Sequence, residues 1–269
     1  MNLRRLRRYW DALGKSDPFW AILTVPEKKG NRWDLDEFLS TGRGEIDDVL
    51  ADLRSLGLEP KSGRALDFGC GVGRLTQALA DRFDEAWGVD IAPSMIELAN
   101  RYSRDPERCR YFLNTRPDLR LFEDESFDFV YSNITLQHVE PRYQGPYLAE
   151  FLRVLVPGGL LVFQLPSTPS NLDVPIASGE YPAPKRRIRE RAKAVTPDPV
   201  LRIYGLLRRG WPMRKVAAPM EMWGMPRDQV EALLVRHGGK LLNTEPDEWA
   251  AGWEGFRYTV AKGEPPHLP

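Results

Sequence analysis

The stretch that decides how this chain folds is Asp67-Phe68-Gly69-Cys70-Gly71-Val72-Gly73. It follows a short apolar run, Ala65-Leu66, and leads into a helical pattern that begins at Arg74. Glycines let the backbone turn tightly and let a ligand come close to the main chain. A helix that begins after such a turn offers free N–H groups and the positive end of its dipole to an anion. The stretch therefore predicts a strand, a ligand-binding turn and a helix.

The spacing of the glycines separates this turn from the dinucleotide-binding fingerprint G-x-G-x-x-G. Here the order is D-x-G-x-G-x-G, with an acidic residue two positions before the first glycine. This pattern resembles motif I of the class I S-adenosylmethionine (SAM) methyltransferases, in particular the type 11/12-like family that acts on small molecules. A nicotinamide oxidoreductase stays an alternative, which the glycine spacing opposes.

The resemblance rests on several motifs in the right order, over about residues 60 to 166. Trp87-Gly88-Val89-Asp90 reads as a second strand that ends in an acid. Ser126 to Asn133 resembles the fourth strand with its entry turn, and Leu136-Gln137-His138-Val139 resembles the segment that follows it. Phe151 to Phe163 contains a Pro-Gly-Gly turn and resembles a helix followed by the fifth strand.

The alternation of strand and helix patterns predicts an α/β fold with a parallel sheet covered by helices on both faces. After residue 225 a further helix, 227–235, precedes two more strands. The resemblance implies a Rossmann-like seven-stranded sheet in the order 3-2-1-4-5-7-6, with the last strand antiparallel. The candidate strands are 64–69, 86–90, 110–113, 127–133, 159–165, 240–244 and 256–261.

We divide the chain into four segments. Residues 1–60 form an N-terminal helical cap, in which residues 4–13, 34–39 and 44–56 have helical patterns. Residues 61–166 form the SAM-binding core, and 226–269 contain its last helix and two closing strands. Residues 167–225 read as a Pro-rich helical insertion, with 11 Lys and Arg against 5 Asp and Glu and therefore a charge of +6. We expect this insertion to serve as a lid or acceptor region.

The composition limits the classes of protein to which the chain can belong. The 269 residues hold 38 Lys and Arg against 38 Asp and Glu, so the net charge does not indicate a nucleic-acid partner. No apolar run of about 18 residues predicts a transmembrane helix, and the basic N-terminus lacks the apolar segment of a secretory signal. Two cysteines and three histidines without CxxC or HxxxH spacing predict no disulfide framework and no metal site. We expect a cytoplasmic protein.

The resemblance assigns the glycine loop to the methionine part of SAM. In the family this loop faces that part of the cofactor, which implies contacts from Gly69, Cys70, Gly71 and Gly73. A small side chain such as that of Cys70 suits a tight loop. Asp67 is expected to support the loop and the region of the ammonium group.

Further positions correspond to the ribose and adenine sites of the family. Asp90 can accept hydrogen bonds from both ribose hydroxyls; the alternative is that it caps the helix that follows. Ile91 and Met95 are expected to enclose the adenine ring, although a Met on a helix face is also typical of a core. Asn114 stands where the family often has an acid for the adenine amino group, and an amide oxygen can accept the same bond. Asn133 is expected beside the sulfonium.

The SAM carboxylate has a candidate site in the N-terminal cap. Thr41-Gly42-Arg43-Gly44 precedes the helix predicted over 44–56, so Thr41 and Arg43 are expected to offer N–H groups or a guanidinium. The alternative is that Thr41 only caps that helix.

A hydroxyl acceptor must lose its proton during methyl transfer, and a general base typically contributes ~10²–10⁴-fold. His138 is the candidate base because it is the histidine nearest a strand end that faces the cofactor. The alternative is that His138 packs or bonds the backbone at its own turn. Glu140 and Tyr143 are weaker candidates and fit a surface position.

The acceptor is less well defined by the sequence. Asn133-Ile134-Thr135-Leu136 replaces the Asn/Asp-Pro-Pro-Tyr sequence with which related enzymes bind planar amino groups, which disfavours nucleic-acid methylation. Trp20, Trp33 and Trp223 are candidates to line the acceptor pocket or to pack the extra segments. The basic insertion suits either an acidic acceptor or peripheral contact with a membrane surface; the alternative is a solvated helix face.

We expect transfer of a methyl group from SAM to an oxygen of a small molecule, or of a glycan or lipid-linked precursor, with S-adenosylhomocysteine (SAH) as product. N- or C-methylation of a small metabolite is an alternative. A non-catalytic SAM- or SAH-binding protein is another.

Overall fold

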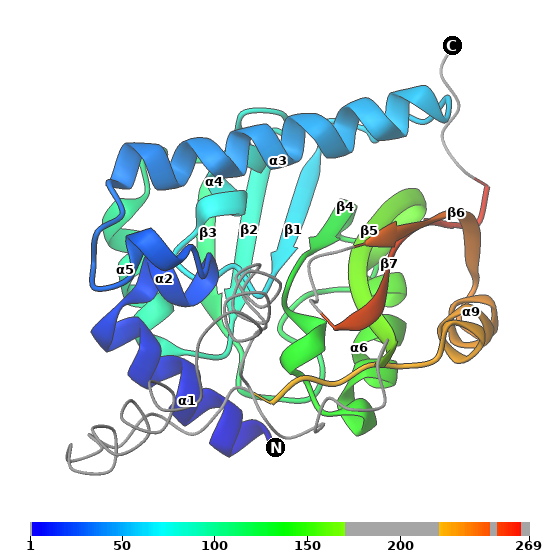
Figure 1. The fold of residues 1–269 in the computed structure, drawn as a ribbon. Helices are drawn as coiled ribbons and strands as arrows, with labels where there is room; N and C mark the ends of the chain where they lie inside the picture. Colours follow the sequence, from blue (N-terminus) through cyan, green and yellow to red (C-terminus); the bar gives the residue numbers. More distant parts are fainter. Residues whose placement is uncertain (1, 170–220, 248–251, 265–269) are drawn as a thin grey trace, which may run out of the picture.

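The computed structural model describes residues 2–169, 221–247 and 252–264, which form one seven-stranded sheet with helices on both faces (Figure 1). The strand order is β3-β2-β1-β4-β5-β7-β6. Neighbouring strands from β3 to β5 pair in parallel, and β7 is antiparallel to both of its neighbours. The predicted fold class and strand order are therefore confirmed. The strands are β1 (Arg64–Phe68), β2 (Glu85–Asp90), β3 (Cys109–Leu113), β4 (Phe127–Ser132), β5 (Leu155–Pro169), β6 (Gly239–Asp247) and β7 (Trp253–Lys262).

Strand β5 is longer than the pattern predicted, because it continues to Pro169 instead of ending at 165. Its last residues pair with the start of β7, where Pro169 lies opposite Trp253. The first three residues of the expected insertion thus belong to the sheet. Residues 170–220 lie outside the described part of the chain, together with the predictions made for them.

Two pairs of helices cover the faces of the sheet (Figure 1). Helices α3 (Leu35–Ser55) and α4 (Arg74–Ala80) bury apolar side chains against one face, and Phe129 and Leu160 belong to the same cluster. Helices α6 (Pro141–Val154) and α9 (Arg227–Arg236) cover the other face. Burial of such apolar area is the main favourable contribution to folding.

Helix α3 is continuous where the sequence indicated two helices with a break near residues 40–43. Gly42 lies inside the helix, and a Cβ at this position would come within 2.4 Å of the Arg74 carbonyl oxygen. The glycine therefore permits close packing of α3 on α4 and does not interrupt the helix. Thr41 Oγ1 donates to the Phe38 carbonyl one turn earlier, at 2.6 Å. The prediction of a helix start after Thr41 was wrong because packing along α3 outweighs the cost of glycine in a helix.

The N-terminal cap begins with two helices, α1 (Leu3–Ser16) and α2 (Pro18–Ile22). Both lie across the carboxyl ends of the central strands (Figure 1). Helix α1 is anchored to the start of α5 (Pro93–Tyr102) by Asp11. Asp11 Oδ1 accepts from the Ser94 N–H at 3.0 Å, and Ser94 Oγ donates to the Asp11 carbonyl at 2.9 Å. Gly14 permits this contact, since a Cβ there would lie 2.3 Å from Ser94 Oγ.

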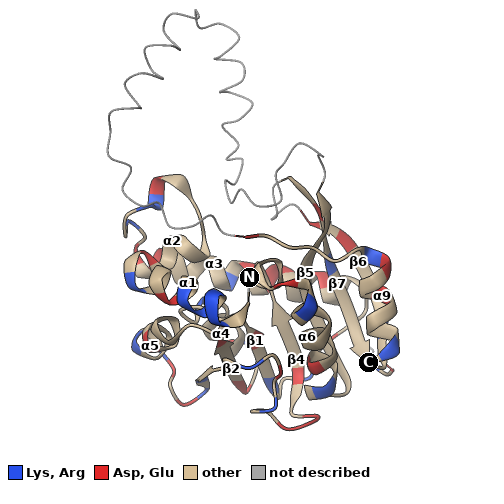
Figure 2. Cartoon of the chain, turned by 90° about the horizontal axis from the view of Figure 1, so that it is seen from below, with Lys and Arg blue, Asp and Glu red and all other residues tan. Residues whose placement is uncertain are grey.

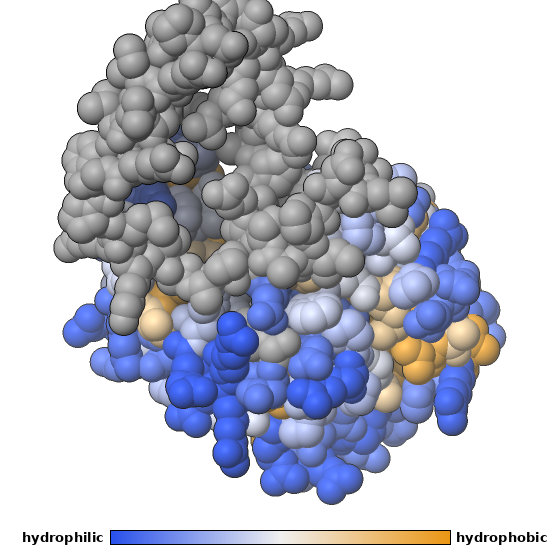
Figure 3. All heavy atoms as spheres, turned by 60° about the horizontal axis from the view of Figure 1, so that its bottom comes forward, coloured by the Kyte–Doolittle hydropathy of each residue, from blue (hydrophilic) through white to orange (hydrophobic). Residues whose placement is uncertain are grey.

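The described surface carries charges of both signs, interspersed over helices and loops (Figure 2). Most of the described surface seen in Figure 3 is hydrophilic. Within residues 2–169, 221–247 and 252–264, no helix combines the length and apolar character needed to cross a membrane.

Candidate cofactor and acceptor site

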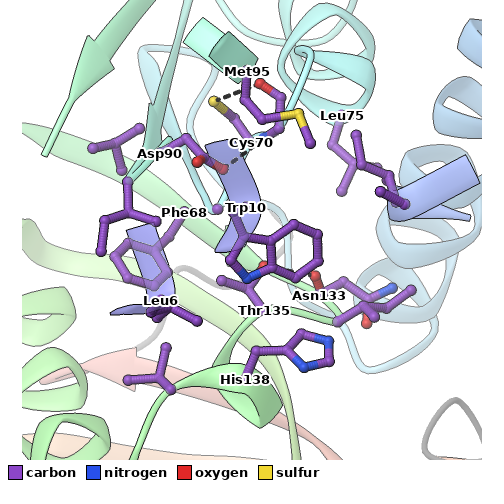
Figure 4. A pocket seen from close by; sticks show the side chains of 18 of the residues that line it. Leu6, Trp10, Phe68, Cys70, Leu75, Asp90, Met95, Asn133, Thr135 and His138 are labelled. Carbon is purple, nitrogen blue, oxygen red and sulfur yellow. Dashed lines mark hydrogen bonds between the residues drawn. The ribbon is translucent and has the colours of Figure 1, made fainter. Parts of the chain in front are cut away.

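A cavity of about 1240 Å³, open mouth included, lies at the carboxyl ends of β1, β2 and β4 (Figure 4). Helices α1 and α2 form its opposite wall. Ligands on open α/β sheets bind at this edge of the sheet.

The glycine loop between β1 and α4 forms the floor of the cavity. Gly69 and Gly71 both have positive φ, +81° and +53°, which favours glycine. A Cβ on Gly69 would lie 2.2 Å from Thr135 Cγ2, and one on Gly71 would lie 2.6 Å from Ile22 Cδ1. The loop is therefore held in close contact with the segment after β4 and with the end of α2. The thiol of Cys70 also lines the cavity, and burial raises its pKa.

Asp67 lies beneath the loop and does not line the cavity. Its Oδ2 accepts a hydrogen bond of 2.7 Å from Thr76 Oγ1 of α4. Burial raises the pKa of Asp67 to about 7. This bond joins β1 to α4 beneath the glycine loop. Support of the ammonium region by Asp67 stays a prediction.

Asp90 lines the cavity at the end of β2 (Figure 4). Its Oδ2 accepts from the Gly71 N–H at 3.0 Å and its Oδ1 accepts from the Ala92 N–H at 2.7 Å. Burial raises the pKa of Asp90 to about 6. An ionised carboxylate has about four lone-pair sites, so each oxygen can accept a further hydrogen bond from a ligand. The Ala92 bond holds the backbone just before α5, but the N-cap of that helix is Ala92 and not Asp90, so the capping alternative was wrong.

Three further expected residues, Ile91, Met95 and Asn114, line the cavity near Asp90. The Asn114 side chain is already engaged in its own turn. Its Nδ2 donates to the Asp118 carbonyl at 2.7 Å, and its Oδ1 accepts from the Arg116 N–H at 3.0 Å. A contact with an adenine amino group would have to share this oxygen with Arg116.

Asn133 lines the cavity at the end of β4 and is held by Glu45 of α3, which the sequence analysis did not single out. Glu45 accepts from Asn133 Nδ2 at 2.7 Å, from the Tyr131 hydroxyl at 2.9 Å and from Arg74 Nη2 at 2.8 Å. Arg74, the first residue of α4, lines the cavity as well. These residues are 29 to 88 positions apart from Glu45 in the chain, so no local pattern joins them.

The structure does not place Thr41 and Arg43 at the cavity wall. Both lie inside α3, and Arg43 is exposed. The helix start that suggested free N–H groups at this point does not exist, so the basis for this assignment was wrong. Among the described residues, Arg74 links Thr41 to the site, since Arg74 Nη1 lies 3.4 Å from Thr41 Oγ1.

His138 lines the cavity in the 3₁₀ turn η2 (Leu136–His138). Its Nδ1 lies 3.3 Å from the Glu221 carbonyl oxygen, which can only accept, so Nδ1 carries the proton. Its Nε2 lies 3.2 Å from Gln137 Nε2 and accepts from it. Gln137 Oε1 in turn accepts from Gln164 Nε2 at 3.3 Å, which fixes the orientation of the Gln137 amide.

Burial lowers the pKa of His138 to about 4. The ring is therefore neutral near pH 7, and its one lone pair points to Gln137. His138 does bond a backbone carbonyl, but that of Glu221, 83 positions away, and not one at its own turn as the alternative expected. Glu140 and Tyr143 do not line the cavity.

Besides Phe68 and Tyr147, the cavity is lined by Trp10 of α1, which lies beside His138 with 5.3 Å between ring centroids (Figure 4). The candidates Trp20, Trp33 and Trp223 do not belong to the lining. Trp33 packs against Phe38 instead. Leu3, Leu6 and Trp10 share one face of α1 at helical spacing, a signal that could have found Trp10. The same spacing is typical of ordinary core packing.

Ile134 has a φ of +55° at the cavity wall, next to Asn133. A β-branched residue with positive φ is strained, and such strain typically costs about 1–3 kcal/mol. It clusters at functional sites because the surrounding structure must enforce it. The amino-acid type at 134 gives no warning of this conformation.

The comparisons with known proteins agree with this geometry. The family described as "Methyltransferase domain" matches residues 66–163. Trans-aconitate 2-methyltransferase from Streptomyces coelicolor is 34% identical over 152 residues, which cover 55% of this chain and 48% of that protein. Ubiquinone biosynthesis O-methyltransferase from Roseobacter denitrificans is 30% identical over 205 residues, 74% of this chain and 75% of that protein. The chain thus spans about half the length of the first relative and three quarters of the second.

Among solved structures, magnesium protoporphyrin IX methyltransferase from Synechocystis PCC 6803 is similar with a TM-score of 0.58. The two proteins are 15% identical, and the alignment covers 97% of this chain. That protein was crystallised with bound SAH and with bound SAM. The alignment covers 99% of its chain in the SAH structure and 97% in the SAM structure. At this identity the likeness concerns the fold.

Proposed function

Because this chain belongs to the class I SAM-dependent methyltransferases, we propose that it transfers the methyl group to an oxygen atom of a small molecule. The observation that carries the proposal is the apolar end of the cavity, where Trp10 lies against the neutral ring of His138. This part of the wall suits a small acceptor with an apolar body and one polar group.

The residues around the cavity fit SAM, which supplies a methyl group already activated on a sulfonium. We assign the ribose hydroxyls to the free lone pairs of Asp90 and the adenine ring to the apolar side chains of Ile91 and Met95. The loop from Gly69 to Gly73, with Cys70 and Gly71, would hold the methionine part. Asn114 and Asn133 would complete the polar contacts.

The acceptor side of the cavity consists of apolar groups from α1, the end of α2 and the turn after β4. Such a wall excludes water and orients an acceptor, and orientation alone can supply roughly 7–11 kcal/mol of a barrier. The residues of this wall are Leu3, Leu6, Trp10, Ile22, Leu23 and Ile134.

His138 is proposed to orient the acceptor hydroxyl through Nε2, after this atom is released by Gln137. A base with a pKa of about 4 deprotonates only a small fraction of hydroxyl groups before the reaction. The proton would pass to His138 Nε2 as the acceptor oxygen takes the methyl group and the S–CH₃ bond gives way to leave SAH, and would then go to water. An acceptor that is already ionised, such as a carboxylate, needs no such step.

The names of the relatives support an oxygen acceptor, since one is an O-methyltransferase of ubiquinone biosynthesis and aconitate is a carboxylic acid. Glycan or lipid-linked acceptors and peripheral membrane contact depend on the basic part of the insertion, and residues 170–220 lie outside the described part of the chain. These ideas, a cytoplasmic location and the absence of a nucleic-acid partner stay predictions.

The test is an acceptor panel of phenols, carboxylic acids, amines and carbon acids, incubated with SAM that carries a deuterated methyl group. Mass spectrometry of the products identifies the atom methylated. We expect labelled ethers or esters from the wild type, and a lower rate for hydroxyl acceptors in His138→Asn. Label transferred to amines or carbon only, unaffected by His138→Asn, would replace the proposal with N- or C-methylation.

A further inference from the structure

Helix α1 has an apolar face and a basic face. Leu3, Leu6 and Trp10 follow one another at helical spacing on the face that lines the cavity. The other face is rich in cations, which are Arg4, Arg5, Arg7, Arg8 and Lys15. The helix holds a single acid, Asp11. Five cations and one carboxylate give α1 a charge of +4, in a chain whose total charge is zero.

Three of these cations have no partner in the described part of the chain. Arg5 approaches Glu221 at 3.8 Å. Arg4, Arg7 and Arg8 are exposed and form no ion pair or side-chain hydrogen bond within residues 2–169, 221–247 and 252–264. Residues three and four positions apart are neighbours on a helix surface. These three residues therefore form one patch, which we call the arginine face.

The arginine face costs α1 stability. The N-terminus of a helix carries a partial positive charge, which favours acids and disfavours cations. The first turn of α1 contains Arg4 and no acid. Arg7 and Arg8 follow in the next turn, where like charges at these spacings repel Arg4. Because the patch is unfavourable for the helix and touches nothing in the described chain, we expect a negatively charged partner outside it.

The arginine face lies on the opposite side of α1 from the acceptor end of the cavity. The inner side of the helix places Trp10 against His138 (Figure 4). Figure 2, turned to show the side of the molecule where α1 lies, has blue stretches along this helix. A helix with its side chains is about 10–12 Å across. A partner bound to the arginine face would therefore lie one helix diameter from the acceptor wall.

A lipid surface fits this face better than a protein partner does. Protein interfaces need a desolvated apolar or aromatic centre, and no large apolar residue of Leu3–Ser16 is exposed. A layer of phospholipid headgroups needs only clustered cations. Arginine suits it because a guanidinium binds phosphate through two parallel hydrogen bonds.

A nucleic acid offers the same phosphates, but the cavity wall beneath the arginine face does not suit a base. Enzymes that act on bases read them by hydrogen bonds in the pocket, whereas α1 contributes Leu3, Leu6 and Trp10 to this wall. An acceptor with an apolar body, as proposed above, concentrates at a lipid surface instead. The wall and the arginine face thus favour the same surroundings.

We propose that the arginine face of α1 binds the phosphate groups of an anionic phospholipid surface and places the acceptor end of the cavity beside acceptors held there. The contact is electrostatic and reversible, because the apolar face of α1 is engaged inside the protein. The part of this inference that concerns the acceptor rests on the proposed function. The lipid contact itself needs neither SAM nor an acceptor.

The experiment is sedimentation of the full chain with two kinds of vesicle, phosphatidylcholine alone and phosphatidylcholine mixed with phosphatidylglycerol. The wild type should bind the mixed vesicles, and salt should release it. One cation near such a surface contributes about fivefold in affinity, so the triple variant Arg4→Gln, Arg7→Gln, Arg8→Gln should bind roughly 100-fold more weakly.

The matched control is the triple variant Arg54→Gln, Arg120→Gln, Arg236→Gln. It removes the same charge from exposed positions on other elements of the fold. We expect its affinity for the mixed vesicles to stay within about twofold of the wild type. Melting curves test folding separately. The variant of the arginine face should melt at the wild-type temperature or above it, because the cations it lacks disfavour the start of α1.

Equal binding of the wild type and the arginine-face variant to the mixed vesicles would overturn the proposal. Binding of the wild type to neither kind of vesicle would do so as well, and so would equal weakening in the control variant. Retention of an RNA duplex in place of vesicles, lost in the arginine-face variant, would assign the face to nucleic acid. The acceptor panel tests the oxygen proposal with dissolved acceptors, so either proposal can fail without the other.

Discussion

Gly42 of α3 and Arg74 of α4 are in such close contact that a Cβ on Gly42 would come within 2.4 Å of the Arg74 carbonyl oxygen and 2.9 Å of its Cγ. Helix α3 can therefore approach the cavity wall only because residue 42 is glycine. Through this contact the position of α3 determines where the guanidinium lies.

Replacement of Gly42 and Gly44 by alanine gives a matched pair. Gly44 is two residues further along the same helix, and a Cβ there meets nothing within 4 Å. Gly44→Ala should raise the free energy of unfolding by up to about 1 kcal/mol, because alanine favours the helix. Gly42→Ala should lower it by roughly 1–3 kcal/mol through overpacking, and should weaken SAH binding. Urea denaturation measures the free energy of unfolding, and calorimetric titration measures the SAH affinity. Equal effects of the two changes would contradict the close contact.

The affinity for SAM should rise with pH between about 5.5 and 8. Burial raises the pKa of Asp67 to about 7 and that of Asp90 to about 6, so both lose their protons in this range. The sulfonium and ammonium of SAM are cations and bind better to the ionised forms. Calorimetry at several pH values measures the slope, which Asp90→Asn should reduce. A flat profile in the wild type would contradict the burial of these two carboxyls.

The same carboxyls should make the free protein less stable as pH rises. Their folded pKa values lie above the ordinary value of 3.8, so the folded state binds more protons than the unfolded chain between about pH 4 and 7. This contribution to stability is complete below about pH 4 and is lost as pH rises through the folded pKa values. Asp67→Asn should remove the part of this pH dependence that Asp67 contributes. Urea denaturation from pH 4 to 8 measures the free energy of unfolding of both proteins.

His138 has the opposite effect on stability. Burial lowers its pKa from 6.5 to about 4, so its contribution is present above pH 6.5 and is lost as pH falls towards 4. The difference between these values corresponds to about 3 kcal/mol. The free energy of unfolding of the wild type relative to His138→Gln should therefore fall by about this amount from pH 7.5 to 4. A constant difference would mean that the ring is not buried in its neutral form.

Trp10 is expected to act on the acceptor and not on the cofactor. Trp10→Leu should raise the acceptor KM roughly tenfold through loss of the aromatic wall beside His138, with SAH affinity within about twofold of wild type. Trp20→Leu serves as control, because Trp20 belongs to the same cap but contacts Lys29 outside the cavity. If both variants behaved alike, the effect would come from the cap as a whole.

The fold was predictable from local patterns. The glycine turn at Gly69 and Gly71 needs positive φ, and the acid at the end of β2 follows a strand that reads clearly in the sequence. These features depend on neighbours in the chain, so the strand order followed once the resemblance was recognised. The break expected inside α3 was wrong because it also relied on a local pattern. Glycine disfavours a helix locally, whereas the packing of Gly42 against Arg74 becomes visible only in the folded chain.

The polar cluster of the site was not predictable, because its members meet only in the folded chain. Glu45 and Asn133 are 88 positions apart, and an acid on an amphipathic helix usually indicates a solvated face. Likewise, the spacing of Trp10 on α1 fits a core as well as a cavity wall. The neutral state of His138 comes from its burial, and its tautomer depends on the Glu221 carbonyl, 83 positions away. Burial, charge pairing and tautomer are properties of the assembled site.

The central claim, a SAM-dependent methyltransferase whose ribose contact is Asp90, is tested most directly by melting curves with SAH, SAM and NAD for the wild type and Asp90→Ala. A ligand at ~100 times its dissociation constant adds about 2.7 kcal/mol, which corresponds to a shift of roughly 5–10 °C for a chain of this size. We predict this shift with SAH and SAM, none with NAD, and at most about half of it in Asp90→Ala, whose affinity should fall more than about tenfold. A shift with NAD alone, or one with SAH that Asp90→Ala leaves intact, would contradict the account.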